Sequence, residues 1–478
     1  MHKRPPLLSR LIRDQQGTIL VFWAVALGVI LGIVALSFDL GRASITRSEL
    51  QSFADSVALA AAGELDGNAD AITRATSAAA LIVDQQSFGN TERVLSGNYT
   101  LTFFASLPAS DATAMTDVTV DPADAIFVRV SVTPTTVEST FGAAFAALTG
   151  RANRDFTLGA TAVAGLSSYA CDVTPMMFCL PSAGYHADDH IGEMILLRSG
   201  GNGAAWGPGD FGFLDPDKVK VDEDGPCAGL NGAQQMACLL GAADHLTQCF
   251  NQRGVDMEPG QKVGLENAIF NVRFDIYNSI MNGKRNNPDY APAPNVIKGI
   301  VPRGGGSCIG NNSNPSPDTV GMPRDDCFGN GSCTRFGNGI WSNGRSTYVT
   351  SNYNGTDPHP AALTRYQYYL AEIATSGAIL TGKAETGRPI CSNSPPAGPD
   401  RRVITVAAID CAANSIRGAA SNVPVAEFFK IFLTEPVQNG GAANRLDIYG
   451  EIIGSASETG TGAGGTGGIF RDVVQLYR

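Results

Sequence analysis

The segment HADDHIGE, residues 186–193, gathers two histidines and three carboxylates within eight positions. His186 and His190 are four residues apart, so on a helix they would share one face and could bind a metal ion. Gly184 before them and Gly192 within the segment disfavour a helix. No glutamate follows the first histidine as it does in zinc proteases. We therefore expect an exposed polar loop here rather than a metal centre.

Two other segments have compositions that could bind ligands. DPDKVKVDEDG, residues 215–225, is acidic enough for calcium, but a twelve-residue calcium loop needs an oxygen ligand where Lys220 stands. GTGAGG, residues 460–465, matches a phosphate-binding glycine pattern, but it opens no recognisable helix and lacks the lysine, so we expect a flexible loop. His245 and His359 are isolated, and no G-x-S-x-G motif occurs. The sequence thus predicts no catalytic residue, metal or cofactor, and a protein that is not an enzyme.

The cysteines point to an oxidising compartment. All ten fall in the part of the chain that would be exported: Cys171, Cys179, Cys227, Cys238, Cys249, Cys308, Cys327, Cys333, Cys391 and Cys411. An even number confined to that part suits disulfides. Their connectivity stays open, with sequence neighbours such as Cys171 with Cys179, or Cys391 with Cys411, as candidates. The five residues between Cys327 and Cys333 do not fit a C-x2-C zinc spacing.

A long apolar run near the N-terminus indicates where the chain would meet a membrane. From Gly17 to Phe38 the chain carries no charge, and a helix of that length spans about 30 Å, the hydrocarbon thickness of a bilayer. The flank at residues 1–16 carries a net charge of +3 and should stay cytoplasmic. The formal charge of −11 therefore leaves −14 on the rest of the chain. That acidic balance disfavours nucleic acid as a partner.

The apolar run is longer than the core of a secretory signal, and it passes into Asp39 and Arg42 without turn-forming residues. We therefore expect a retained anchor. Ala35-Leu36-Ser37 forms a weak cleavage site, so a removed signal peptide stays the alternative.

Beyond Asp39 the small apolar residues repeat with a helical period. The positions Leu50, Ala54, Val57, Ala58, Ala61 and Leu65 form one narrow stripe. Small side chains let another helix approach closely, so the stripe predicts a packing surface rather than a catalytic one. It could pack on a partner helix or on the protein's own outer domain, because the period is the same in both cases. The candidate contact residues are Asp39, Arg42, Leu50, Ala54, Asp55, Ala58 and Ala61.

The N-terminal segment also carries a family resemblance. It has a glycine before the apolar run, an acidic residue closing the run at Asp39, Gly41-Arg42 next, and a helix ending in Ala54-Asp55 and the alanines 60–62. This ensemble resembles the TadG-like proteins of the Flp pilus-assembly TadE/G-like family. WGPGDFGFLD at 206–215, RFDIY at 273–277 and the C-terminal DVVQLYR resemble the longer TadG-like proteins.

The resemblance implies a single-pass protein of the bacterial inner membrane, with a cytoplasmic N-terminus and a periplasmic body. The implied partners are tight-adherence pilus machinery proteins and pilin-like helices. Two family features do not carry over. Type IV prepilins have glutamate five residues after the cleavage-site glycine, where this chain has Phe22 after Gly17, and no Asp-x-Ser-x-Ser metal motif of a von Willebrand A domain occurs.

The patterns predict a mixed α+β and α/β protein. We expect a cytoplasmic flank at 1–16, a transmembrane helix at 17–38, a pilin-like stalk helix region at 39–90, a small α+β module at 91–166 and a Cys-containing, loop-rich α/β ectodomain at 167–478. In the module, Val128, Val130 and Val132 alternate with polar residues as in a half-buried strand. Thr135 and Glu138 form a capping box for a helix that Gly150 ends.

In the ectodomain, loops rich in Gly, Pro and Asn alternate with firmer elements. We expect a helix over 262–282, a strand buried on both faces over 402–410, and further elements at 423–437 and 445–454. Disulfides should stabilise the loops.

These features predict a membrane-anchored, non-enzymatic accessory protein of tight-adherence pilus assembly that acts by protein contacts. One alternative is an adhesin that binds carbohydrate or matrix through the loops of Trp206 and Trp341. The other is a metal-dependent envelope hydrolase that uses residues 186–193.

Overall fold

The fold is known from a computed structural model, which describes most of the chain. The described residues are 18–82, 85–88, 91–94, 98–108, 110, 113–150, 152, 155–171, 173–201, 203–215, 227–243, 249–251, 254–257, 263–303, 312–375, 379–439, 446–456 and 470–477. The flank 1–16, Cys308, GTGAGG and all but Asp215 of the acidic segment lie outside them. The chain divides into two compact units: unit 1 is Met1–Ser167 with Val473–Arg478, and unit 2 is Ser168–Asp472.

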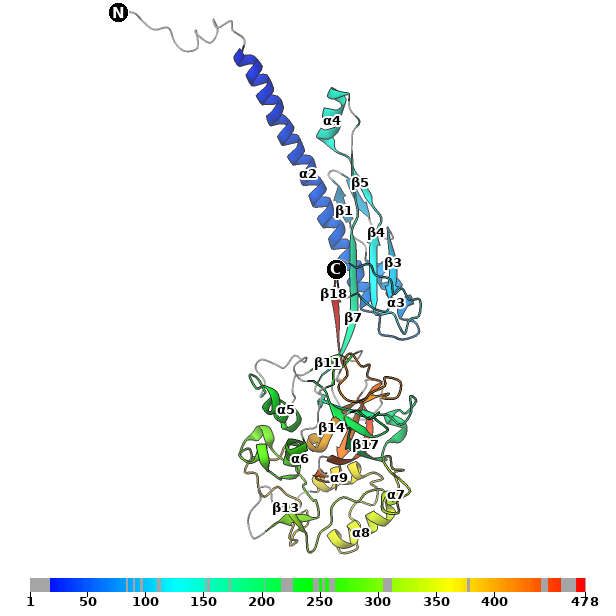
Figure 1. The fold of residues 1–478 in the computed structure, drawn as a ribbon, viewed down its shortest axis with the longest axis vertical. Helices are drawn as coiled ribbons and strands as arrows, with labels where there is room; N and C mark the ends of the chain where they lie inside the picture. The colour runs from blue at the N-terminus through cyan, green and yellow to red at the C-terminus, as the bar shows by residue number, and fades with distance from the viewer. Residues whose placement is uncertain are drawn as a thin grey trace, which may run out of the picture. The chain divides into compact units, whose positions relative to one another are not determined.

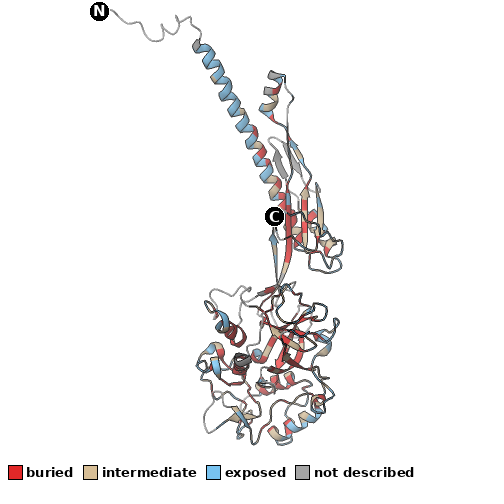
Figure 2. Cartoon of the chain, in the orientation of Figure 1, coloured by how far each residue is buried: buried red, intermediate tan, exposed pale blue. Residues whose placement is uncertain are grey.

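Unit 1 is built on one long helix, α2 (Thr18–Ala62), of 45 residues. Its sequence has no proline and is rich in Ala, Leu and Val, so the helix runs on for about 68 Å at 1.5 Å per residue. The N-terminal half of α2 is exposed, and its C-terminal half has a buried face (Figures 1 and 2). A second helix, α3 (Ala71–Leu81), buries its alanines at 71, 75 and 79 in the same unit.

A small antiparallel sheet covers the buried half of α2. It contains β3 (Tyr99–Phe104), β4 (Phe127–Val132) and β7 (Thr161–Cys171, in unit 1 up to Ser167), and β18 (Phe470–Leu476) pairs with β7. Val130 lies opposite Leu101 on one side and Ala162 on the other. The alternation predicted for this strand is confirmed, because Val128, Val130 and Val132 are buried and pack in one core with α2.

A strand arm in unit 1 carries a short apolar helix. β5 (Thr135–Val137) pairs antiparallel with β6 (Phe156–Leu158), and α4 (Thr140–Thr149) lies between them in the sequence. The predicted capping box is wrong, since the β-branched Thr135–Val137 forms the strand β5 and the helix starts five residues after Thr135. The predicted end is confirmed: Gly150 is the C-cap with φ 66°, a left-handed conformation that favours glycine.

The helix region expected over residues 39–90 is also shorter than predicted. Its last helix, α3, ends at Leu81, and β1 (Gln85–Phe88) and β2 (Thr91–Val94) form an antiparallel pair after it. Phe88 pairs with Thr91, so two residues separate the paired strands in the sequence.

Unit 2 is organised around a mixed sheet. Its strands are β8 (Met176–Cys179), β9 (Met194–Ser199), β10 (Asp210–Phe213), β14 (Val403–Ile409), β15 (Glu427–Leu433), β16 (Gln438–Asn439) and β17 (Leu446–Ser455). Their order is β15-β14-β8-β10-β9-β17-β16, and β15 also pairs with β17. Among the described residues these pairings close a ring of strands, which leaves few free sheet edges.

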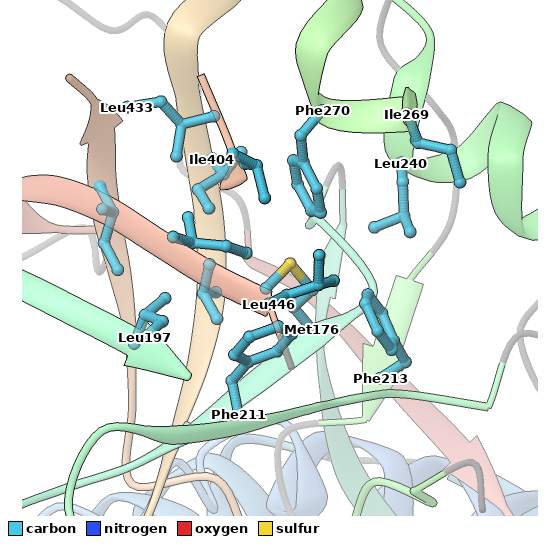
Figure 3. Close-up of a cluster of buried hydrophobic side chains, with 14 of the residues drawn as sticks. Met176, Leu197, Phe211, Phe213, Leu240, Ile269, Phe270, Ile404, Leu433 and Leu446 are labelled. Carbon is cyan, nitrogen blue, oxygen red and sulfur yellow. The ribbon is translucent and has the colours of Figure 1, made fainter. Parts of the chain in front are cut away.

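Both faces of this closed sheet are covered. Val406 and Ala408 of β14 join one core cluster, whereas Ala407 and Ile409 join another. The predicted strand buried on both faces is therefore confirmed. Figure 3 shows the first cluster, where Met176, Leu197 and Ile404 of the strands pack with Leu240 and Phe270 of two helices.

The helices of unit 2 are α5 (Gly232–Gly241), α6 (Val263–Asn271), α7 (Asp326–Gly329), α8 (Ser342–Tyr353) and α9 (Arg365–Ala374). The helix expected over 262–282 is shorter, because Asp275 takes a left-handed conformation (φ 62°) after a 3-10 turn over Val272–Phe274. The elements α8 and α9 were not predicted. The shorter strand pieces are β11 (Cys249–Asn251), β12 (Ile300–Pro302) and β13 (Asn312–Pro315).

The disulfides differ from the neighbour pairs considered above. Cys179 bonds to Cys411, across a sequence separation of 232. β8 and β14 pair in parallel with Cys179 opposite Ile409, which brings Cys411 close, so Cys171–Cys179 and Cys391–Cys411 are both wrong. Cys227–Cys238 and Cys327–Cys333 are short-range disulfides. Cys171 is also disulfide-bonded, and in the sheet register it lies opposite Cys249.

Candidate functional site

The N-terminal half of α2 presents apolar side chains on all sides. Among the described residues, α2 is the one helix long and apolar enough to cross a membrane. Large side chains along the run from Ile19 to Leu40 are about half exposed or more, including Leu20 (77%) and Phe22 (68%). A helix that is apolar all round and uncovered by protein suits a lipid environment.

Asp39, at the end of this run, caps another helix. Its carboxylate accepts backbone N–H groups from the first turn of α4: Thr140 at 3.1 Å, Phe141 at 3.1 Å and Gly142 at 2.8 Å. The side chain is almost fully buried, with 5% of the residue exposed. A carboxylate at a helix N-terminus satisfies donors that lack an intrahelical partner and interacts favourably with the helix dipole. Asp39 therefore ties α4 to α2.

Two contacts beside Asp39 also hold α4 against α2. The guanidinium of Arg42 donates from Nη1 to Oγ1 of Thr140 at 2.5 Å. One turn away, the rings of Phe38 and Phe141 meet edge to face with centroids 5.2 Å apart. The two candidates Asp39 and Arg42 thus act together, in a contact within the chain.

The remaining candidates lie further along α2. Leu50, Ala54, Ala58 and Ala61 are fully buried and belong to the core that α2 shares with α3 and the sheet of unit 1. Asp55 lies beside that core and accepts a hydrogen bond from the amide of Gln51 at 2.8 Å. Of the two readings left open by the sequence, the structure favours packing of the stripe on the protein's own domain.

Comparison with known proteins gives one match on this helix. Residues 17–64 match the family model described as Putative Flp pilus-assembly TadE/G-like. The chain carries a TadE/G-like segment. This confirms the resemblance to TadG-like proteins. No curated protein and no solved structure matches the chain.

The matched TadE/G-like segment includes Asp39, whose loss should release α4. We expect Asp39→Ala to destabilise the docked helix by about 2 kcal/mol, because three backbone donors lose a charged acceptor. Hydrogen exchange of the α4 amides, measured on the full chain in a lipid nanodisc, should accelerate about thirtyfold. Asp39→Asn keeps one acceptor and should show a smaller effect. Unchanged α4 exchange in Asp39→Ala would contradict the capping role.

Outside the TadE/G-like segment, residues 186–193 do not form the metal cluster considered above. Ala187–His190 is a single 3-10 turn in which Asp188 and Asp189 are exposed. His190 pairs with Glu193 (Nδ1 to Oε2, 3.0 Å) and stacks on Tyr185, whereas His186 faces Glu427 at 3.5 Å. Within the described part of the chain no three His, Cys, Asp or Glu side chains gather in a way that could hold a metal ion.

The two tryptophans on which the adhesin alternative rests both make contacts within the chain. Trp341 is 5% exposed, and its indole N–H donates to the carbonyl of Leu363 at 3.1 Å. The Trp206 ring lies so close to Gly200 that a Cβ there would meet it at 2.3 Å. The Trp341 indole is therefore closed off from solvent, whereas Trp206 is half-buried.

Unit 2 contains a buried ion cluster that sequence reasoning missed. Arg365, at the start of α9, pairs with Asp325 and with Glu451 (3.1 Å), and all three side chains are fully buried. Burial raises the pKa of Glu451, and Arg365 opposes that rise. Asp325 also accepts backbone N–H groups from Asn338 and Gly339, so the cluster joins α9, β17 and a long loop.

A second buried carboxyl, that of Glu372, lies in the last turn of α9. Glu372 accepts hydrogen bonds from the hydroxyls of Tyr348 (2.7 Å) and Tyr353 (2.6 Å) and from the amide of Asn295 (2.8 Å). Burial raises the pKa of Glu372 to about 7 despite these donors. The site holds α8 against α9.

The raised pKa predicts how unit 2 responds to pH. The folded state holds the Glu372 proton more tightly than the unfolded state does, so protonated Glu372 stabilises the fold. This stabilisation is complete below about pH 4.5 and is lost as the pH rises through about 7. We expect the free energy of unfolding to fall by about 3 kcal/mol over that interval. Urea unfolding at a series of pH values tests this. Glu372→Gln should flatten the slope, and an equal slope in the variant would refute the assignment.

Proposed function

We propose that the protein is a membrane-anchored, non-enzymatic accessory protein of Flp, or tight-adherence, pilus assembly. The observation that carries the proposal is the family match over residues 17–64, which coincides with a helix exposed and apolar in its first half and built into unit 1 in its second. α2 would span the inner membrane with the N-terminus in the cytoplasm, as the basic flank favours. Units 1 and 2 would then lie in the periplasm, where disulfides form.

The proposed mechanism is protein contact rather than chemistry. The stripe at Leu50–Ala61 is occupied by the protein's own core, so a partner helix would use the exposed half of α2. Gly28 and Gly32 lie there at a GxxxG spacing, and a Cβ at either would meet nothing within 4 Å. Glycines at this spacing let two membrane helices approach closely.

Surface pili provide the primary test. Deletion of the gene should abolish surface Flp-type pili, and complementation with the intact protein should restore them. Normal pili on the deletion strain would contradict the assembly role. Normal pili together with lost attachment would favour the adhesin instead.

The contact surface is tested separately. Gly28→Leu combined with Gly32→Leu should reduce crosslinking of the protein to pilus machinery proteins about tenfold or more, because side-chain bulk keeps the helices apart. Ala26→Leu adds apolar bulk on another side of α2 and is the control for position. Equal loss in both variants, or in neither, would argue against this face as the partner contact.

A further inference from the structure

The helix α4 is unusually apolar for a helix outside a membrane-spanning segment. Its ten residues, TFGAAFAALT, carry no charge. Phe141 is 41% exposed, and Ala144 and Ala147 are exposed as well. Among the α4 side chains that the structure describes, Ala146 alone is buried. The described part of α4 therefore presents three apolar residues, Phe141, Ala144 and Ala147, that protein does not cover.

The N-terminal end of α4 is satisfied without water, because Asp39 accepts the N–H groups of the first turn. At the other end the N–H of Gly150 bonds to the carbonyl of Ala146. An unsatisfied backbone group costs several kcal/mol in hydrocarbon, so an ordinary solvated helix end cannot enter it. The buried Asp39 carboxylate removes that obstacle at the N-terminus of α4.

The position of α4 matches the level at which α2 would leave a bilayer. Asp39 is the first charged residue after the apolar run, and it contacts the first turn of α4 directly. Phe38, the last residue of the run, packs on Phe141. Figure 1 shows α4 at the tip of the β5–β6 arm, beside the exposed half of α2 and away from α3.

We propose that α4 is a second membrane contact, which enters the outward-facing leaflet beside α2 and is held there by Asp39. This inference rests on the membrane anchoring proposed above. The occupant of its exposed face is lipid, because that face is continuous with the lipid-facing surface of α2. In the sequence Arg151 and Arg154 follow α4, and basic residues next to an apolar segment favour lipid phosphates.

Depth-dependent quenching tests the proposal on the full chain. Single cysteines at Ala144 and Ala147 are labelled with an environment-sensitive fluorophore, and the protein is reconstituted in vesicles of phosphatidylethanolamine and phosphatidylglycerol containing brominated acyl chains. Ala24→Cys, in the exposed half of α2, is the positive control. Ala80→Cys, exposed in α3, is the negative control. The parent chain measures the background from its native cysteines.

We expect the α4 labels to be quenched at least half as strongly as the Ala24 label, with no quenching at Ala80. Quenching at Ala24 without quenching at Ala144 and Ala147 would overturn the proposal for α4 and leave the anchor standing. Absence of quenching at Ala24 would overturn the anchor and the α4 proposal together. Adding Asp39→Ala should lower quenching at Ala147 about twofold or more and leave Ala24 unchanged, which a general loss of reconstitution would not do.

Discussion

Replacing Arg365 by alanine should destabilise unit 2 by about 4 kcal/mol. The substitution leaves the carboxylates of Asp325 and Glu451 together in the interior without their counter-ion. Removal of one partner from a buried ionic cluster is costly because the remaining charges cannot regain water. Urea unfolding of the full chain, followed by hydrogen exchange of the β17 amides, measures the loss.

The same variant should change its dependence on pH. Without Arg365, the pKa of Glu451, which burial already raises, should rise further. The variant should then recover part of its stability at about pH 5 relative to about pH 8, since protonation removes the uncompensated charge. Arg198→Ala breaks a pair with Asp447 that is partly exposed, and it should cost about 1 kcal/mol or less. An equal loss in both variants would contradict a special role for the buried cluster.

Ala54→Leu combined with Ala58→Leu should unfold or strongly loosen unit 1. Both alanines are fully buried on the face of α2 that packs in the unit 1 core. Adding bulk to a close-packed core costs about 2 kcal/mol at each site. The urea midpoint for exchange of the α3 amides should fall accordingly.

Ser48→Leu combined with Ser52→Leu is the matched control, because it adds bulk at two exposed positions of α2 that lie one helical turn apart. This control should alter stability by about 0.5 kcal/mol or less. The two double variants also decide what the stripe does. If the Ala54 and Ala58 variant stays folded but loses its pilus partners, the stripe is an interface after all. If it loses partners only as it unfolds, the stripe is core.

Local sequence patterns predicted the elements whose buried face repeats regularly along a single helix or a single strand. The three- and four-residue spacing from Leu50 to Ala61 identified the buried face of α2, and the alternating valines identified β4. The family resemblance of the N-terminal segment likewise rested on contiguous residues. The buried face of α2 and the strand β4 depend on a period that the sequence shows directly.

The features that were missed depend on long-range contacts. The cap of α4 comes from Asp39, about 100 residues earlier in the sequence, whereas the local pattern indicated Thr135 and Glu138. Cys179 finds Cys411 only because two distant strands pair. For α9 a local signal existed, since Thr364 and Gln367 form a capping box.

The order of the chain has a mechanical consequence. Unit 2 is inserted within unit 1: the chain leaves unit 1 through β7 and returns to it through β18, which pairs with β7. Neither end of unit 2 is therefore free. A load applied to unit 2 would be shared by two covalent connections that enter neighbouring strands, and unit 2 could not be peeled apart from a loose terminus. Tension between the two units would therefore be carried by β7 and β18 together.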